Sequence, residues 1–131
     1  MKIVLFICVH NSGRSQMAEA FFNQMAKGKA VAISAGTEPG SGVNPVVVQA
    51  MREVGIDISG RKPKLLTQEM VENADLAITM GCMDEAKSCP AAFVPSEDWG
   101  LPDPHGKPIE EVRPIRDEIK RRVELLIKRL T

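Results

Sequence analysis

Residues 2–7, K-I-V-L-F-I, form an unbroken apolar run near the start of this chain. A run of this kind, apolar at every position, is typical of a central parallel strand that is buried on both faces. After Cys8 and a five-residue loop, apolar side chains recur at helical spacing from residue 14 to about residue 27. A strand, a short loop and a helix in this order predict the first unit of an α/β fold.

The rest of the chain alternates between strands and helices in the same way. We expect further strands at residues 30–34, 75–80 and 92–94. We expect three more helices. The first is capped by Asn44, has Pro45 at its first position and ends at Gly55, and the second is capped by Thr67 and ends near residue 73. The third begins at about residue 112, because Pro114 is tolerated only in the first turn of a helix. The pattern predicts a single α/β domain, residues 1–131, built as a three-layer sandwich around a central parallel sheet of about four strands.

The loop after the first strand carries the candidate chemistry. Such a loop, closing onto a helix start, points backbone N–H groups inward, and the helix dipole adds partial positive charge at the same place. We therefore expect it to hold a tetrahedral oxyanion. The same field favours the thiolate form of Cys8, which is the nucleophilic form, and Ser15 can donate a hydrogen bond to that sulfur. The expected anion ligands are Val9, His10, Asn11, Ser12, Gly13 and Arg14.

Three residues of the loop have more specific expectations. Arg14 offers a planar fork of donors that suits two oxygens of one anion, which a lysine does not match. Asn11 is expected to adopt a left-handed conformation, with its amide tying the loop together. His10 would be a costly choice if its backbone needed a positive φ. We interpret His10 and His105 as loop residues rather than catalytic ones.

Two further thiols, Cys82 and Cys89, follow the expected strand at 75–80. The carboxyl ends of parallel strands share one edge of a sheet, so Cys82 can lie near Cys8. If residues 82–89 were helical, the two Cα atoms would be about 10 Å apart, whereas a disulfide needs roughly 4.4 to 6.8 Å. Helix and disulfide therefore exclude each other, and oxidation would rearrange the segment. The alternatives are buried structural cysteines or a metal site of three cysteines and a histidine.

Asp103 lies between two prolines in the stretch L-P-D-P at 101–104. A rigid backbone holds a carboxyl group in one position, as a general acid requires. The alternative is an ordinary solvated aspartate in a turn.

The net charge, the lengths of the apolar runs and the number of cysteines indicate which partners and which cellular location to expect. The 17 basic and 17 acidic side chains give no net charge, so a nucleic-acid partner is not expected. No stretch approaches 18 consecutive apolar residues, and the apolar run at the start of the chain is too short for the hydrophobic region of a signal peptide with its cleavage site. We therefore expect a cytoplasmic location without membrane contact. Three cysteines without an export signal favour transient redox chemistry over static disulfides.

Five stretches, spread over nearly the whole chain, carry a resemblance to a known family. They are C-V-H-N-S-G-R-S-Q-M-A-E at 8–19, I-S-A-G-T at 33–37, N-P at 44–45, T-M-G-C-M-D-E-A-K-S-C-P at 79–90 and D-W-G-L-P-D-P at 98–104. The chain resembles the low-molecular-weight protein tyrosine phosphatase superfamily and, within it, the thioredoxin-coupled arsenate reductases.

The resemblance adds expectations for single residues. It implies that Asp103 donates a proton to the leaving group, as in the phosphatases, or faces the anion, as in the reductases. The phosphatases commonly place aromatic residues after this Asp-Pro pair, whereas here the chain continues H-G-K at 105–107 and contains no Tyr. In some reductases, residues matching Asn11, Glu19 and Ser34 bind a monovalent cation together with an Asp. Lys64 stands at that Asp position, so we expect no bound metal and no other cofactor.

The sequence thus favours an arsenate reductase. We expect Cys8 to attack arsenate, Asp103 to help an oxygen leave as water, and Cys82 to attack the Cys8 sulfur so that arsenite departs. We expect Cys89 then to attack Cys82, and thioredoxin or a similar dithiol protein to reduce the resulting disulfide. The alternatives are a tyrosine or small-molecule phosphatase that uses Cys8, Arg14 and Asp103, and a non-enzymatic sensor of oxyanions or redox state. Phosphate, which is also tetrahedral, can occupy the same loop.

Overall fold

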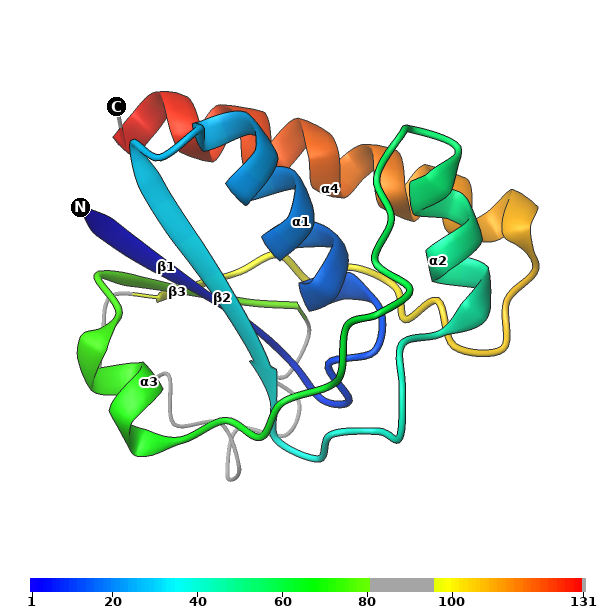
Figure 1. Cartoon of the computed structure of the whole chain (residues 1–131), viewed down its shortest axis with the longest axis horizontal. Helices are drawn as coiled ribbons and strands as arrows, with labels where there is room; N and C mark the ends of the chain where they lie inside the picture. The colour runs from blue at the N-terminus through cyan, green and yellow to red at the C-terminus, as the bar shows by residue number, and fades with distance from the viewer. Residues whose placement is uncertain (81–95, 131) are drawn as a thin grey trace.

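The computed structural model describes residues 1–80 and 96–130 (Figure 1). In chain order the elements are β1 (Lys2–Cys8), α1 (Arg14–Ala26), β2 (Ala30–Gly36), α2 (Pro45–Arg52), α3 (Gln68–Asn73), β3 (Leu76–Thr79), β4 (Ser96–Asp98) and α4 (Ile109–Leu130). All pairings in the sheet are parallel, in the order β2-β1-β3-β4. The expected parallel sheet of about four strands is confirmed. The strand expected at 92–94 lies outside the described residues, and β4 follows it at Ser96–Asp98.

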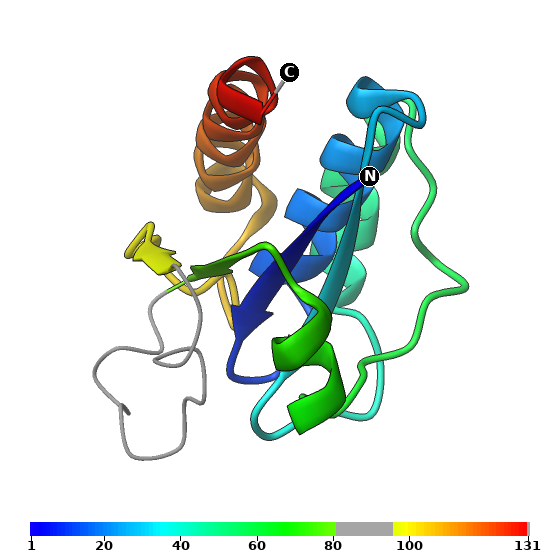
Figure 2. The same cartoon turned by 90° about the vertical axis from the view of Figure 1, so that its left-hand side faces the viewer.

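Strand β1 is buried on both faces, as its apolar run predicted. Val4 and Phe6 pack into a core shared with α1, α2 and α4. Leu5 and Ile7 point the other way and pack against Val71 of α3. Helices therefore cover both faces of the sheet (Figure 2), and the predicted three-layer sandwich is confirmed.

The expected start of the last helix was wrong. Helix α4 begins at Ile109, so Pro114 lies inside the helix and not in its first turn. Proline there removes one backbone hydrogen bond. Packing of Ile109 against the core and the favourable placement of Glu110 and Glu111 in the first turn offset that loss. Neither α4 nor any other helix within residues 1–80 and 96–130 is long and apolar enough to cross a membrane.

Two side-chain caps form as expected. Asn44 Oδ1 accepts the backbone N–H of Val46 at 2.9 Å and starts α2. Thr67 Oγ1 accepts the N–H of Met70 at 3.2 Å and starts α3. Strand β2 continues past the expected end at residue 34 to Gly36. The caps at Asn44 and Thr67 fix where the loops that precede α2 and α3 end.

An ion-pair cluster joins α2 to α4. Glu53, directly after α2, accepts hydrogen bonds from Arg113 at 2.7 Å and from Arg116 at 2.8 Å, both on α4. The hydrogen bonds from Arg113, with a further contribution from Arg116, lower the pKa of Glu53 from 4.5 to about 2. The carboxylate form is therefore favoured in the folded protein relative to the unfolded chain.

The lowered pKa of Glu53 predicts how the unfolding free energy depends on pH. A carboxyl group whose pKa is lower in the folded state stabilises the protein fully above its unfolded pKa of 4.5, and the contribution is lost as the pH falls toward about 2. Glu53→Gln should therefore lower the unfolding free energy at pH 7 and reduce its decline between pH 4.5 and pH 2. Urea unfolding at several pH values measures this, with Glu72→Gln, an exposed position on α3, as the control. An unchanged pH dependence in Glu53→Gln would contradict the assignment.

Candidate active site

The loop between β1 and α1 turns its carbonyl groups outward. Four of its carbonyl oxygens accept N–H groups from the segment after β2: Cys8 from Thr37 (3.3 Å), Val9 from Glu38 (2.8 Å), His10 from Gly40 (3.0 Å) and Ser12 from Asn44 (2.8 Å). In a trans peptide unit the C=O and N–H groups point in opposite directions. The N–H groups of the following residues, Val9, His10, Asn11 and Gly13, therefore face the inside of the loop. This arrangement is suited to a tetrahedral anion.

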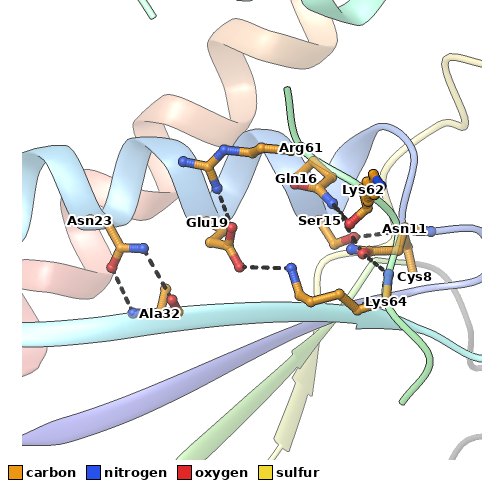
Figure 3. Close-up of polar contacts among 10 residues, drawn as sticks. All are labelled: Cys8, Asn11, Ser15, Gln16, Glu19, Asn23, Ala32, Arg61, Lys62 and Lys64. Carbon is orange, nitrogen blue, oxygen red and sulfur yellow. Dashed lines mark hydrogen bonds and ion pairs between the residues drawn. The ribbon is translucent and has the colours of Figure 1, made fainter. Parts of the chain in front are cut away.

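Cys8 lies at the base of this loop, at the end of β1, and is 3% exposed. Its Sγ accepts the backbone N–H of Asn11 at 3.2 Å and lies 2.8 Å from Ser15 Oγ. Ser15 Oγ in turn accepts a hydrogen bond from Asn11 Nδ2 at 2.7 Å (Figure 3). A thiolate can only accept, so the Ser15 hydroxyl then donates to it. A Cys8 thiolate would thus receive two hydrogen bonds.

Asn11 adopts the left-handed conformation expected for it, with φ of 51°. Its buried amide ties the loop together through Ser15, and that prediction is also confirmed. Outside glycine, only Asn11 and Lys27 have positive φ among the described residues, so His10 carries no such strain. His10 is exposed, with Nδ1 lying 3.0 Å from the Glu38 carbonyl oxygen, which fits its interpretation as a loop residue.

Arg14 and Asp103 lie at the same end of the sheet. The buried guanidinium donates through Nη1 to the Leu101 carbonyl at 2.8 Å and to the Met80 carbonyl, while Nη2 lies 4.0 Å from Asp103 Oδ2. Asp103 is about half exposed, and its Oδ1 accepts the N–H of His105 at 3.0 Å. Residues that follow β1, β3 and β4 therefore meet at the carboxyl edge, where ligands of parallel sheets bind. Cys8, Arg14, Ser15 and Asp103 are brought together there.

Two glycines lie too close to neighbouring atoms to carry a side chain, which was not foreseen from the sequence. A Cβ at Gly36 would lie 2.5 Å from the Val9 carbonyl oxygen and 3.0 Å from the Asn11 nitrogen, both backbone atoms. A Cβ at Gly13 would lie 2.8 Å from Cγ of Pro104. The absence of a side chain at Gly36 therefore lets the end of β2 pack directly against the loop after β1. The absence of a side chain at Gly13 lets the turn that contains Asp103 and Pro104 pack against the same loop. The glycine within I-S-A-G-T at 33–37 was the available signal for Gly36.

Cys82, Cys89 and the segment between them lie outside the described residues, so the rearrangement of this segment on oxidation stays a prediction.

Of the three residues that the resemblance assigned to a monovalent cation, Glu19 and Asn11 already have other partners, whereas the buried Ser34 hydroxyl has no hydrogen-bond partner among the described residues. Glu19 is already ion-paired with Arg61 and with Lys64, whose Nζ lies 3.5 Å from Oε1. Asn11 Oδ1 already accepts two hydrogen bonds, from the Lys64 backbone N–H and from a glutamine side chain. A metal cation placed beside two positive side chains would be repelled. Within residues 1–80 and 96–130, no group of three or more His, Cys, Asp or Glu side chains is arranged to hold a metal ion.

The fold and the site define an α/β protein in which a cysteine at the end of a central strand lies under a loop of inward-facing amides. The family model described as low molecular weight phosphotyrosine protein phosphatase matches residues 3–131. The chain belongs to this family.

Its relatives include reductases. The chain is 43% identical to arsenate reductase 2 of Staphylococcus epidermidis over 125 residues, which is 94% of each protein. A solved arsenate reductase in the phosphate-binding state is 36% identical over all of both chains, with a TM-score of 0.86. A thioredoxin-dependent arsenate reductase of Corynebacterium glutamicum is 38% identical, with a TM-score of 0.80, and the match covers 98% of this chain and 61% of that one.

Proposed function

We propose that this chain is an arsenate reductase that converts arsenate to arsenite through Cys8, Cys82 and Cys89, with thioredoxin or a similar dithiol protein as the reductant. The observation that carries the proposal is the 43% identity to a curated arsenate reductase over 94% of each chain. The buried Cys8 under inward-facing amides supplies a site of the right chemistry. Because the relay needs reduced thiols, we place it in the cytoplasm.

The loop binds arsenate first. The inward N–H groups of Val9, His10 and Gly13 and the helix dipole of α1 attract the anion, while the Asn11 N–H bonds to Cys8 Sγ. Arg14 adds a charged donor at the side of Asp103. Arg14 Nη1 donates to the Met80 and Leu101 carbonyls, which orients the guanidinium and leaves Nη2 to donate to the anion. The anion is thus held above Cys8 Sγ.

The first chemical step makes a bond between sulfur and arsenic. The Cys8 thiolate attacks arsenic(V), one arsenic–oxygen bond breaks, and Asp103 gives a proton to the departing oxygen, which leaves as water. Hydrogen bonds from Ser15 and from the Asn11 N–H keep the sulfur in place for this attack. Arsenic is still in the +5 state at the end of the step.

The electron transfer follows when a second thiolate attacks. Cys82 attacks the Cys8 sulfur, a disulfide forms between them, and the arsenic–sulfur electron pair stays on arsenic, which leaves as arsenite. Cys89 then attacks Cys82, which frees Cys8 as a thiolate and leaves a disulfide between Cys82 and Cys89. A dithiol protein reduces that disulfide and is itself oxidised. Phosphate can bind the same loop, but phosphorus(V) does not accept these electrons, so selectivity lies in the redox step.

A phosphatase is the second candidate, because the family model is described by that activity. A groove of about 960 Å³ lies beside the loop and is lined by His10 and Ser12, by residues 40–46 and by residues 105–108. Among the residues that the structure describes, the lining holds no aromatic side chain other than imidazole, so they give an aryl phosphate little to stack on. This observation favours the reductase over an aryl phosphatase.

One pair of assays separates the two candidates. We expect arsenate-dependent oxidation of a reduced thioredoxin system at a rate well above the hydrolysis of an aryl phosphate ester by the same protein. Cys82→Ser should remove the reduction and leave any hydrolysis unchanged, because hydrolysis needs only one essential thiol. If hydrolysis dominates in the wild-type protein and arsenate is not reduced, the phosphatase is the better assignment.

A further inference from the structure

The segment of residues 61–66 crosses the end of β2 and the start of α1 without regular secondary structure. The Lys64 carbonyl accepts the N–H of Gly36 at 2.8 Å, and the Leu66 N–H donates to the Gly36 carbonyl at 2.9 Å. On the other side, Gln16 Nε2 lies 3.4 Å from the Lys62 carbonyl. The segment therefore contacts β2, whose end lies beside the Cys8 loop, and α1, which follows that loop.

The backbone of this segment orients Asn11. Asn11 Oδ1 accepts the Lys64 N–H at 2.9 Å and Gln16 Nε2 at 3.1 Å. Because both neighbours are donors, the carbonyl side of the Asn11 amide must face them, and its Nδ2 must face Ser15. The Lys64 backbone thus sets the direction of the hydrogen bond that reaches Ser15, and Ser15 contacts the Cys8 sulfur.

Side chains of the same segment are anchored on a buried charge. Glu19 lies one helical turn after Ser15 on α1, and its side chain is 8% exposed. Lys64 approaches it along β2 with Nζ 3.5 Å from Oε1, and Arg61 approaches the other oxygen (Figure 3). A buried carboxylate is costly unless it is paired, so this carboxylate holds the 61–66 segment against α1.

We propose that Lys64 is a positioning residue for the reaction at Cys8. Its ammonium binds Glu19 and its backbone N–H binds Asn11, so that one residue couples a buried ion pair to the hydrogen bonds that orient Ser15 and Cys8. Since Lys64 and Arg61 already neutralise Glu19, the protein needs no monovalent metal cation at this place. The kinetic part of this inference rests on the proposed function.

The test compares Lys64→Met with Lys64→Arg, which keeps the charge, and with Lys62→Met, an exposed lysine two positions away. We expect Lys64→Met to lower kcat for arsenate reduction by about tenfold to 100-fold, with a smaller change in KM, because misplacement of reacting groups acts on the chemical step. Lys64→Arg should restore most of kcat, and Lys62→Met should match the wild-type protein. If Lys64→Met does not fold, Lys64→Gln gives the same comparison.

Salt provides an independent readout. At constant ionic strength, wild-type turnover and melting temperature should be equal in potassium, sodium and choline chloride. In Lys64→Met, potassium or sodium should recover part of the lost kcat relative to choline, because Glu19 then lacks one of its two positive partners. A wild-type protein that requires potassium, or a Lys64→Met variant with full kcat, would overturn the proposal.

A third measurement separates this inference from the proposed function. The rate at which iodoacetamide alkylates Cys8 in the reduced protein, followed by mass spectrometry of the Cys8 peptide, does not depend on arsenate chemistry. We expect it to fall in Lys64→Met and to stay unchanged in Lys62→Met. If the wild-type protein does not reduce arsenate but this difference appears, the proposed function fails and the positioning role stands. Equal alkylation rates in all variants would show that Lys64 does not position Cys8, whichever reaction the protein catalyses.

Discussion

Cys8→Ser should lower arsenate reduction by roughly 10⁴-fold or more and should also abolish any hydrolysis of phosphate esters. Both reactions need the sulfur as nucleophile, and a serine hydroxyl stays protonated near neutral pH and attacks far more weakly. The substitution is small, and a hydroxyl at this place can still bond to Ser15 and to the Asn11 N–H. The fold should therefore survive. Thioredoxin-coupled turnover and a thermal melt measure the two outcomes.

The same variant should keep its anion site. The inward N–H groups and Arg14 remain, so phosphate should still stabilise it, by about 2.7 kcal/mol when phosphate is at 100 times its Kd. Arg14→Lys is the matched control, because it keeps the charge but loses the planar fork, and should show a weaker phosphate effect. Substantial reduction by Cys8→Ser would sink the assignment of the nucleophile. A wild-type melt indifferent to phosphate would count against the anion loop.

The parts of the site that could be predicted from sequence are those with local causes. The apolar run at residues 2–7 predicts a doubly buried strand because burial on both faces leaves no polar alternation. The left-handed Asn11 and the caps at Asn44 and Thr67 follow from side chains that bond to nearby backbone. Each of these signals is complete within a few residues of the chain.

The parts that were missed depend on contacts between distant residues. The family resemblance grouped Lys64 with Asn11 and Glu19, but nothing near Lys64 in the sequence shows that its backbone N–H meets Asn11 or that its ammonium meets Glu19. The need for glycine at residue 36 arises only when the loop after β1 crosses the end of β2. Pro114 was placed wrongly because packing of Ile109 against the core, together with Glu110 and Glu111 in the first turn, lets α4 begin earlier than the proline alone suggested.

The order of the thiol relay gives the last prediction. If Cys82 attacks Cys8 before Cys89 acts, Cys89→Ser should complete one turnover and then stop with a disulfide between Cys8 and Cys82. Cys82→Ser should stop earlier, at the adduct of arsenic with Cys8. The wild-type protein, given one equivalent of arsenate and no reductant, should end with Cys82 bonded to Cys89 and with Cys8 free.

These three end states differ in which cysteine can be alkylated, so mass spectrometry of the non-reduced digest distinguishes them. Arsenite released per protein should be about one equivalent in the wild type and in Cys89→Ser, and close to none in Cys82→Ser, because the arsenic–sulfur bond breaks only when a second thiolate attacks Cys8. A disulfide between Cys8 and Cys89 in Cys82→Ser, formed at the full first-turnover rate, would contradict this order. Cys89 would then reach Cys8 directly, and Cys82 would not be a required intermediate in carrying the oxidation outward to the reductant.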